Sequence, residues 1–408
     1  MNHRYLVHLT ATCGLMLALV ALFNLIVDPN DFWRLVRHPG FNLPKARPAG
    51  QIAQRKLFSA VAFRPEAVIL GNSRADIGFN PAHPDLQRRA GRTYNLAVPG
   101  AGIDASANLL AGLCSEVRPN LVLFGVDFID FLSAPGDSKE DTAPSQLRTR
   151  PTFVDRLQWL LTADATMESA RSLRAQLAAF PQVMLPDGFN PLHDYIPIAR
   201  SAGYQALFEQ RLQENISAYR GVRMTSGEPG ATEAPEVRAL RRMIRTAGKC
   251  GAELVLVTYP YHSQLLLLFD ELGLWPQFEQ WKRVIVRVVD EERARDESLK
   301  VRLFDYAYFS GPSQEAIPAA GDRSSEMRWY WEAGHFKKTL GDRVLATVLA
   351  GVDSPTAKAT LNGLVISGAN VESWLAEVRQ QKREFVALRP PDLEVVRRAV
   401  ARSKAPST

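Results

Sequence analysis

Cysteine is scarce in this chain, with three residues in 408: Cys13, Cys114 and Cys250. They form no CxxC pair and no Cys/His spacing typical of metal ligands, which argues against a disulfide-stapled scaffold and against a zinc site. Cys13 lies in an apolar N-terminal run, so only Cys114 and Cys250 remain to pair, and only in an oxidising compartment. The sequence favours two separate buried thiols.

The chain also lacks clustered charge, internal repeats and low-complexity tracts. Its formal net charge is +6, but Lys and Arg are interspersed with Asp and Glu. This pattern argues against a nucleic-acid partner, which needs a basic patch. Hydrophobic residues make up 46% of the 408 residues. That is enough for one large α/β domain with additions, or for two modest domains.

The longest apolar run, Tyr5 to Val27, lies near the N-terminus. At about 1.5 Å per residue it can cross a hydrocarbon core of about 30 Å. The run is long for a signal peptide, and no small-x-small cleavage site precedes Asp28, which favours an uncleaved anchor. We therefore expect a lipid bilayer to surround residues 5–27. Basic residues flank both ends of the run, so charge alone leaves the orientation open.

The remaining chain divides by composition into an α/β domain and additions. Five short apolar runs alternate with helical periodicity, which predicts a parallel sheet with right-handed crossovers. These runs are Ala67–Leu70, Thr93–Val98, Asn120–Val126, Glu253–Tyr259 and Val301–Phe304. The predicted organisation is an anchor at 1–28, a linker at 29–60, a domain at 61–352 with a mainly helical insertion at 133–234, and a helical tail at 353–408.

The first apolar run ends in a small-residue turn that presents Ser73 where a helix should begin. Open α/β sheets place nucleophiles at this position, between a strand end and a helix N-terminus. Backbone N–H groups and the helix dipole there would stabilise an oxyanion. On this segment alone, an N-cap role for the serine is the more common one.

A nucleophilic serine needs a base, and two of the seven histidines follow predicted strands. His262 follows the fourth strand and His335 follows the fifth. Glu332 precedes His335 by three residues, close enough to fix its tautomer and stabilise the imidazolium. The alternative is a surface Glu–His pair on one helical turn. His335 is the preferred base and His262 the alternative.

Four segments, in this order, resemble the sequence blocks of the SGNH (GDSL-like) hydrolase superfamily: Gly71-Asn72-Ser73, Asn95 to Gly102, Gly125-Val126-Asp127 and Glu332 to His335. The resemblance covers most of the chain except the anchor, the insertion and the tail. It implies a flavodoxin-like three-layer α/β/α sandwich with a central parallel sheet of about five strands.

The resemblance also implies site roles. Ser73 takes the place of the nucleophile and His335 that of the base. The family's Asp, three residues before the histidine, falls on Glu332. The second-block glycine, whose N–H donates to the oxyanion, corresponds to Gly100 or Gly102. The Ser73 N–H is the other backbone donor of the oxyanion hole.

Two positions depart from the family pattern. Glu332 is one methylene longer than Asp, which other triads tolerate. Asp127 stands where the third block usually has an Asn oxyanion donor, and an ionised Asp cannot donate a hydrogen bond. Either Asp127 is protonated, or it points elsewhere and the hole consists of N–H groups alone. Asp127, Asp130 and Asp305 also remain candidates for the third triad member.

A membrane helix followed by an early Gly-x-Ser block and a late His block is similar to membrane-anchored proteins of bacterial envelope acylation. The resemblance implies a serine esterase or O-acyltransferase with an acyl-Ser73 intermediate and no metal or organic cofactor. It would be single-pass in a bacterial-type inner membrane and face the periplasm. Its substrate would be a carbohydrate or ester, with an integral-membrane acyl donor as a possible partner. The alternative is an inactive SGNH-fold scaffold or carbohydrate-binding component.

Overall fold

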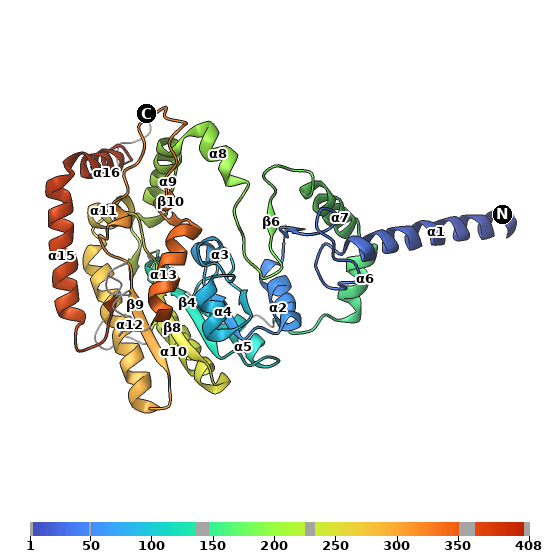
Figure 1. Ribbon diagram of the computed structural model, residues 1–408, viewed down its shortest axis with the longest axis horizontal. Helices are drawn as coiled ribbons and strands as arrows, with labels where there is room; N and C mark the ends of the chain where they lie inside the picture. The colour runs from blue at the N-terminus through green and yellow to red at the C-terminus, as the bar shows by residue number, and fades with distance from the viewer. Residues whose placement is uncertain (1–2, 49, 135–146, 225–232, 351–363, 404–408) are drawn as a thin grey trace.

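The computed structural model describes residues 3–48, 50–134, 147–224, 233–350 and 364–403. Its centre is a parallel five-stranded sheet in the order β3-β2-β4-β8-β9, and a short strand, β12, pairs antiparallel with β9 (Figure 1). Each predicted apolar run forms one of the five parallel strands. Their bounds are β2 Ala67–Leu70, β3 Thr93–Asn95, β4 Leu121–Val126, β8 Glu253–Thr258 and β9 Val301–Asp305, and β12 is Leu364–Val365.

Sequence explains these elements locally. Every residue of β2 and β4 is buried, as expected for a continuous apolar run in a sheet covered on both faces. Helix α10 (Pro235–Cys250) begins with proline at its first turn, where no N–H is needed, and ends at Gly251 with φ 80°. Its buried apolar residues recur every three or four positions, which turns one face toward the sheet.

Helices cover both faces of the sheet. One group comprises α2 (Ile52–Phe63), α5 (Ile103–Cys114), α10 and α12 (Trp275–Arg295), in which α5 packs on α2 and α10, and α10 on α12. The other group comprises α3 (Ser73–Gly78), α4 (Pro84–Ala90) and α13 (Lys338–Ala350), which also pack together. Right-handed crossovers between parallel strands place the two groups on opposite faces.

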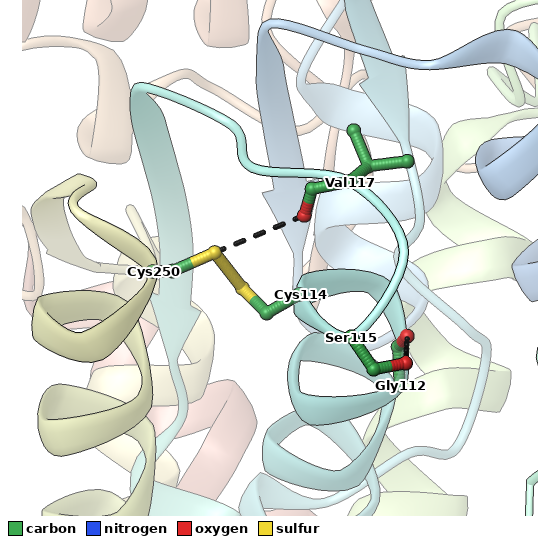
Figure 2. The surroundings of a disulfide bond; sticks show 5 residues. All are labelled: Gly112, Cys114, Ser115, Val117 and Cys250. Carbon is green, nitrogen blue, oxygen red and sulfur yellow. Dashed lines mark hydrogen bonds between the residues drawn. A yellow bond between two sulfur atoms is a disulfide. The ribbon is translucent and has the colours of Figure 1, made fainter.

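Cys114 and Cys250 form a disulfide with a Cα–Cα distance of 5.8 Å (Figure 2). The expectation of two separate thiols is therefore wrong. The two cysteines are the last residues of α5 and α10, which pack side by side and end at the same edge. The two cysteines are 136 positions apart, so nothing in the local sequence indicates that they are close in space.

The segment predicted as an insertion is mainly helical in its described part. It contains α6 (Phe153–Leu161), α7 (Ala163–Ala175), α8 (Tyr195–Ala202) and α9 (Tyr204–Tyr219). Residues 135–146 and 225–232 of this segment lie outside the described part of the chain. Two pairs of short antiparallel strands connect it to the rest of the chain: β5 (Leu132–Ser133) with β7 (Arg223–Met224), and β6 (Val183–Met184) with β1 (Lys45–Ala46).

The sequence composition predicted the C-terminal tail better than it predicted the linker at 29–60. The described part of the predicted tail has two helices, α15 (Val371–Leu388) and α16 (Pro390–Arg402); residues 351–363 and 404–408 lie outside the described part. The predicted linker at 29–60, in contrast, contains β1 and most of α2. Leu57, Phe58 and Ala60 of α2 are buried, although the Pro- and Gly-rich residues before them dominate the local composition.

Helix α1 (His3–Val27) has a mean hydropathy of 2.2 over its best 18-residue window and is long and apolar enough to cross a membrane. Most of it is exposed, but Asn24 and Val27 are buried. The Asn24 amide donates to Leu160 O (2.9 Å) and to Thr166 Oγ1 (3.0 Å). Lys45 Nζ donates to Val27 O (2.8 Å), so the last turn of α1 belongs to the folded domain.

Candidate active site

Ser73 is the first residue of α3, directly after the turn that ends β2. Gly71 has φ 140°, and a Cβ there would lie 2.3 Å from the Tyr259 hydroxyl, so the turn requires glycine. Asn72 is the N-cap: its side chain accepts a hydrogen bond from Arg74 N (3.0 Å). Because Asn72 caps the helix, the Ser73 hydroxyl is left for another partner.

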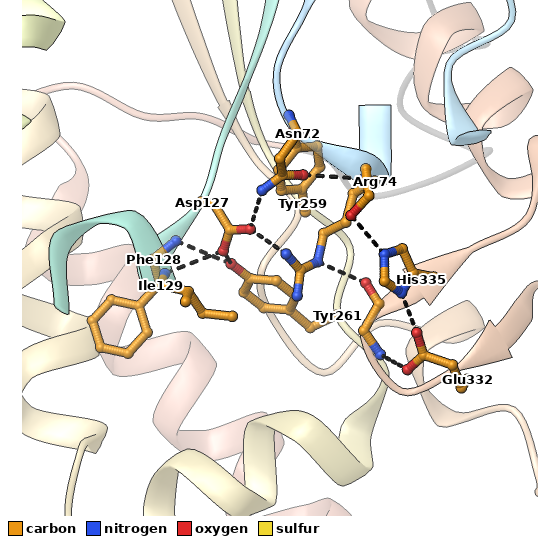
Figure 3. Close-up of polar contacts among 11 residues, drawn as sticks. Asn72, Arg74, Asp127, Phe128, Ile129, Tyr259, Tyr261, Glu332 and His335 are labelled. Atoms are coloured by element: carbon orange, nitrogen blue, oxygen red, sulfur yellow. Dashed lines mark hydrogen bonds and ion pairs between the residues drawn. The ribbon is translucent and has the colours of Figure 1, made fainter. Parts of the chain in front are cut away.

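That partner is His335. Ser73 Oγ lies 2.8 Å from His335 Nε2. On the other side of the ring, His335 Nδ1 bonds to Glu332 Oε1, as Figure 3 shows. Glu332 and His335 are register partners in the antiparallel hairpin of β10 (Tyr330–Glu332) and β11 (His335–Phe336). The alternative of a surface pair on one helical turn is wrong, because the hairpin buries Glu332 to 1% exposure.

Glu332 is held as a carboxylate despite this burial. Burial alone would raise its pKa, but His335, Arg211 and the Gly334 N–H lower the pKa to about 2. Gly334 N donates to Glu332 Oε2 (2.7 Å), and Arg211 Nε lies 3.4 Å from Oε1. An acceptor fixed at Nδ1 selects the tautomer whose Nε2 is free to accept the Ser73 proton.

Asp127 does not serve as an oxyanion donor in this geometry. The side chain is buried and bonds to the Arg74 guanidinium, to Asn72 Nδ2 (2.6 Å) and to the Tyr261 hydroxyl (2.5 Å). Both carboxylate oxygens therefore accept, so the oxyanion role expected from the third block is wrong for this residue. Of the two possibilities left by the sequence, Asp127 pointing elsewhere is the one observed.

Arg74 is the residue that sequence reasoning missed. Its guanidinium pairs with Asp127, and its Nε donates to Gly334 O (2.7 Å) in the turn between Glu332 and His335. Although burial opposes its charge, the neighbouring Asp127 raises the pKa of Arg74. One side chain thus connects the turn that carries Ser73, the end of β4 and the hairpin that carries His335 (Figure 3). Its position next to Ser73 was the only available signal.

Backbone donors near Ser73 remain available for an oxyanion. Val98 N donates to Gly71 O (3.0 Å), which holds the loop carrying Gly100 and Gly102 against the Ser73 turn. Gly100 has φ 75° and Gly102 is the N-cap of α5. Within the described ranges, the N–H groups of Ser73, Gly100 and Gly102 have no protein acceptor. Gly100 and Gly102 therefore stay candidates alongside Ser73.

The other acidic candidates lie elsewhere. Asp305 is fully buried and accepts from Lys282 Nζ (2.6 Å), Trp374 Nε1 (2.7 Å) and Thr258 Oγ1 (2.6 Å). It ties the end of β9 to α12 and α15. Asp130 lies in the 3-10 turn η1 (Phe128–Phe131), facing Gly102. Since Glu332 already occupies His335 Nδ1, neither Asp130 nor Asp305 takes the place behind the histidine.

His262, the alternative base, is buried with both ring nitrogens engaged. Its Nε2 lies 2.8 Å from Glu315 O, and its Nδ1 accepts from Gln264 N (3.1 Å) as the N-cap of α11 (Ser263–Glu271). These bonds make His262 a neutral helix cap. Its assignment as alternative base is not supported, because Ser73 bonds to His335 and His262 is satisfied by backbone groups.

This arrangement predicts a pH dependence of stability. Burial lowers the pKa of His262 from 6.5 to about 4, so the folded protein binds fewer protons than the unfolded chain between these values. The contribution of neutral His262 to the free energy of unfolding is therefore fully present above pH 6.5. It falls as the pH drops toward 4, by on the order of 3 kcal/mol. His262→Asn keeps a capping side chain but does not titrate, so its loss of stability over this range should be smaller.

Urea unfolding of both proteins at several pH values between 7 and 4 measures this difference. Parallel pH profiles for the wild type and His262→Asn would contradict the neutral-cap assignment.

The described residues contain no group of three or more His, Cys, Asp or Glu side chains that would hold a metal ion. Known protein-family models and curated proteins give no match to this chain. The functional interpretation therefore rests on the geometry around Ser73.

Proposed function

We propose that this protein is a serine acyl-transfer enzyme of the SGNH type, in which Ser73 is the nucleophile, His335 the general base and Glu332 the residue that orients it. The observation that carries the proposal is the 2.8 Å contact between Ser73 Oγ and His335 Nε2, with Glu332 on the far ring nitrogen. A nucleophile bonded to a base that is itself held by a carboxylate is the arrangement required for covalent catalysis.

In the proposed reaction, Ser73 Oγ attacks an ester carbonyl carbon and its proton passes to His335 Nε2. The carbonyl oxygen becomes an oxyanion, for which the Ser73 N–H and the Gly100 or Gly102 N–H are the proposed donors. Collapse breaks the ester C–O bond, and His335 returns the proton to the leaving alcohol. Water or a sugar hydroxyl then gives its proton to His335 and attacks the acyl carbon of the acyl-serine. Collapse breaks the bond between that carbon and Ser73 Oγ, and His335 returns the proton to Ser73 Oγ.

The strand order supports the finer fold assignment, a flavodoxin-like three-layer sandwich. Numbered along the chain, the parallel strands lie in the order 2-1-3-4-5. In such sheets ligands bind at the carboxyl ends of the first and third strands, where the order reverses. Ser73 follows the first of these strands, β2, and Asp127 follows the third, β4.

For location, we propose an uncleaved single-pass anchor with the domain on the extracytoplasmic, periplasmic side of a bacterial-type inner membrane. The buried bonds of Asn24 argue against removal of α1, because they make its last turn part of the domain. The disulfide argues for the oxidising side, since cytoplasmic thiols are kept reduced.

Thiol counting tests this placement. In full-length protein alkylated during lysis and denatured, only Cys13 should react before reduction, and all three cysteines afterwards. Three reactive thiols before reduction would place the domain in a reducing compartment. Cys114→Ser together with Cys250→Ser should lower the free energy of unfolding by roughly 4 to 5 kcal/mol, because the closed loop is long.

The proposed substrates are acyl esters of an envelope or exported polysaccharide, with an integral-membrane protein as the possible acyl donor. Tethering supports transfer, since a free esterase has less need of an anchor. A cavity of about 260 Å³ lies against the hairpin that carries Glu332 and is lined by Tyr204, Trp331, Arg200 and Lys337, among others. Aromatic rings beside cationic groups suit a carbohydrate that carries negative charge.

The test uses the full chain in detergent with p-nitrophenyl acetate as the probe. We expect an acetyl group on Ser73 by mass spectrometry. Equal rates for the wild type, Ser73→Ala and His335→Ala would instead favour the inactive scaffold. Added candidate oligosaccharides separate the two activities: acetylated sugar indicates a transferase, and release of acetate alone indicates an esterase.

A further inference from the structure

Helix α6 has an apolar face that points away from the domain. Phe153, Val154, Leu157 and Leu161 are 73%, 59%, 39% and 39% exposed. At 3.6 residues per turn, the four side chains fall within an arc of about 100°. Exposed apolar residues scattered singly are ordinary, but a contiguous stripe along one helix marks an interaction surface.

The side of α6 that faces the domain is partly buried. Trp159 contacts Phe32 and Phe58, with ring centroids 4.9 and 5.9 Å apart. Leu160 O accepts the Asn24 amide of α1 (2.9 Å). These contacts hold α6 to the domain and to the end of α1, while its apolar stripe stays exposed.

The place of α6 in the molecule indicates what its apolar stripe contacts. α6 packs against α1, and in Figure 1 it runs across the direction of α1 at the end of the domain from which α1 projects. Leu22 and Ile26 near the same end of α1 are also exposed, at 51% and 36%. A bilayer crossed by α1 would therefore meet the domain at α6. Arg156, also exposed on α6, suits the phosphate groups of that surface.

We propose that α6 lies in the headgroup and acyl-chain boundary of the bilayer that α1 crosses, with its apolar stripe toward the lipid. This rests on the proposed membrane anchor. One helix across the membrane leaves a domain free to tilt, whereas a second, in-plane contact on a rigid junction fixes its orientation. The Ser73 site would then stand at a constant height above the membrane.

Spin labels on the full chain in lipid nanodiscs test this proposal. In a Cys13→Ser background the remaining cysteines are paired, so single labels can be placed with Leu157→Cys or Leu161→Cys. Leu388→Cys is the matched control, because this leucine is 81% exposed on α15, at the other end of the molecule from α1 (Figure 1). Leu19→Cys reports on the anchor itself.

At positions 157, 161 and 19 we expect oxygen to relax the label more than a water-soluble nickel chelate does; at 388 the order should reverse. Labels at positions 157 and 161 that behave like the label at 388 would overturn the α6 proposal. If the label at position 19 is in lipid in the same sample, the proposed anchor still holds. Low accessibility to both reagents at 157 would indicate a protein partner or a second copy, which also overturns it. A label in water at position 19 would overturn the anchor as well.

Discussion

Ser73→Ala is expected to lower kcat/KM for p-nitrophenyl acetate by about 10³-fold or more and to remove the acetyl-protein species. The Ser73 hydroxyl is the group within hydrogen-bond reach of His335, and alanine leaves no oxygen to form the ester. Removing the Ser73 hydroxyl leaves the N-cap of α3 intact, because the Asn72 side chain accepts the hydrogen bond from Arg74 N. The variant should therefore fold as the wild type does, and the loss should be confined to turnover.

Ser263→Ala is the matched control. Ser263 is also the first residue of a helix that follows a parallel strand, and a neighbouring side chain, His262, caps that helix. Activity should stay within about twofold, as for a substitution away from the reacting groups. If Ser263→Ala and Ser73→Ala lose activity equally, or if neither does, Ser73 is not the nucleophile.

His335→Ala should match the loss of Ser73→Ala, and the double variant should be no slower than either single one. Residues that act as one unit are strongly non-additive, because each is useless without the other. Additive losses would show that Ser73 and His335 act separately, in spite of their 2.8 Å contact.

The parallel sheet was predictable because each strand is a short apolar run between polar turns. Such a run can be recognised from adjacent residues in the sequence alone, as Val68 to Leu70 illustrates. The disulfide between Cys114 and Cys250 was not predictable, since it depends on which helices pack together across 136 positions. Helix α2 was partly missed for a related reason: its buried face is defined by the domain it packs on.

The same distinction separates the parts of the site. Glu332 and His335 are close in sequence, so a three-residue spacing was enough to pair them. Asp127 and Arg74 are 53 positions apart, and nothing local shows that Asp127 has a guanidinium as its partner. His262 was correctly located after a strand, but its two backbone bonds follow from the path of distant loops.

Glu332→Gln is expected to lower kcat by about 10³- to 10⁴-fold with little change in KM, although glutamine has the same shape. Two donors converge on this side chain, Gly334 N–H on one oxygen and His335 Nδ1 on the other. A glutamine has one oxygen to offer. If that oxygen accepts from Gly334, the amide NH₂ faces His335 and forces the proton onto Nε2, where the ring can no longer accept the Ser73 proton.

Glu332→Asp is the control that separates charge from geometry. Aspartate is one methylene shorter than glutamate, and it remains a carboxylate that can accept from both donors. We expect it to keep most of the wild-type kcat, and to form acetyl-Ser73 at a rate well above that of Glu332→Gln. If Glu332→Gln keeps the wild-type kcat, the carboxylate does not set the tautomer of His335. If aspartate is as slow as glutamine, the reach of the longer side chain, rather than its charge, is what positions the imidazole over Ser73.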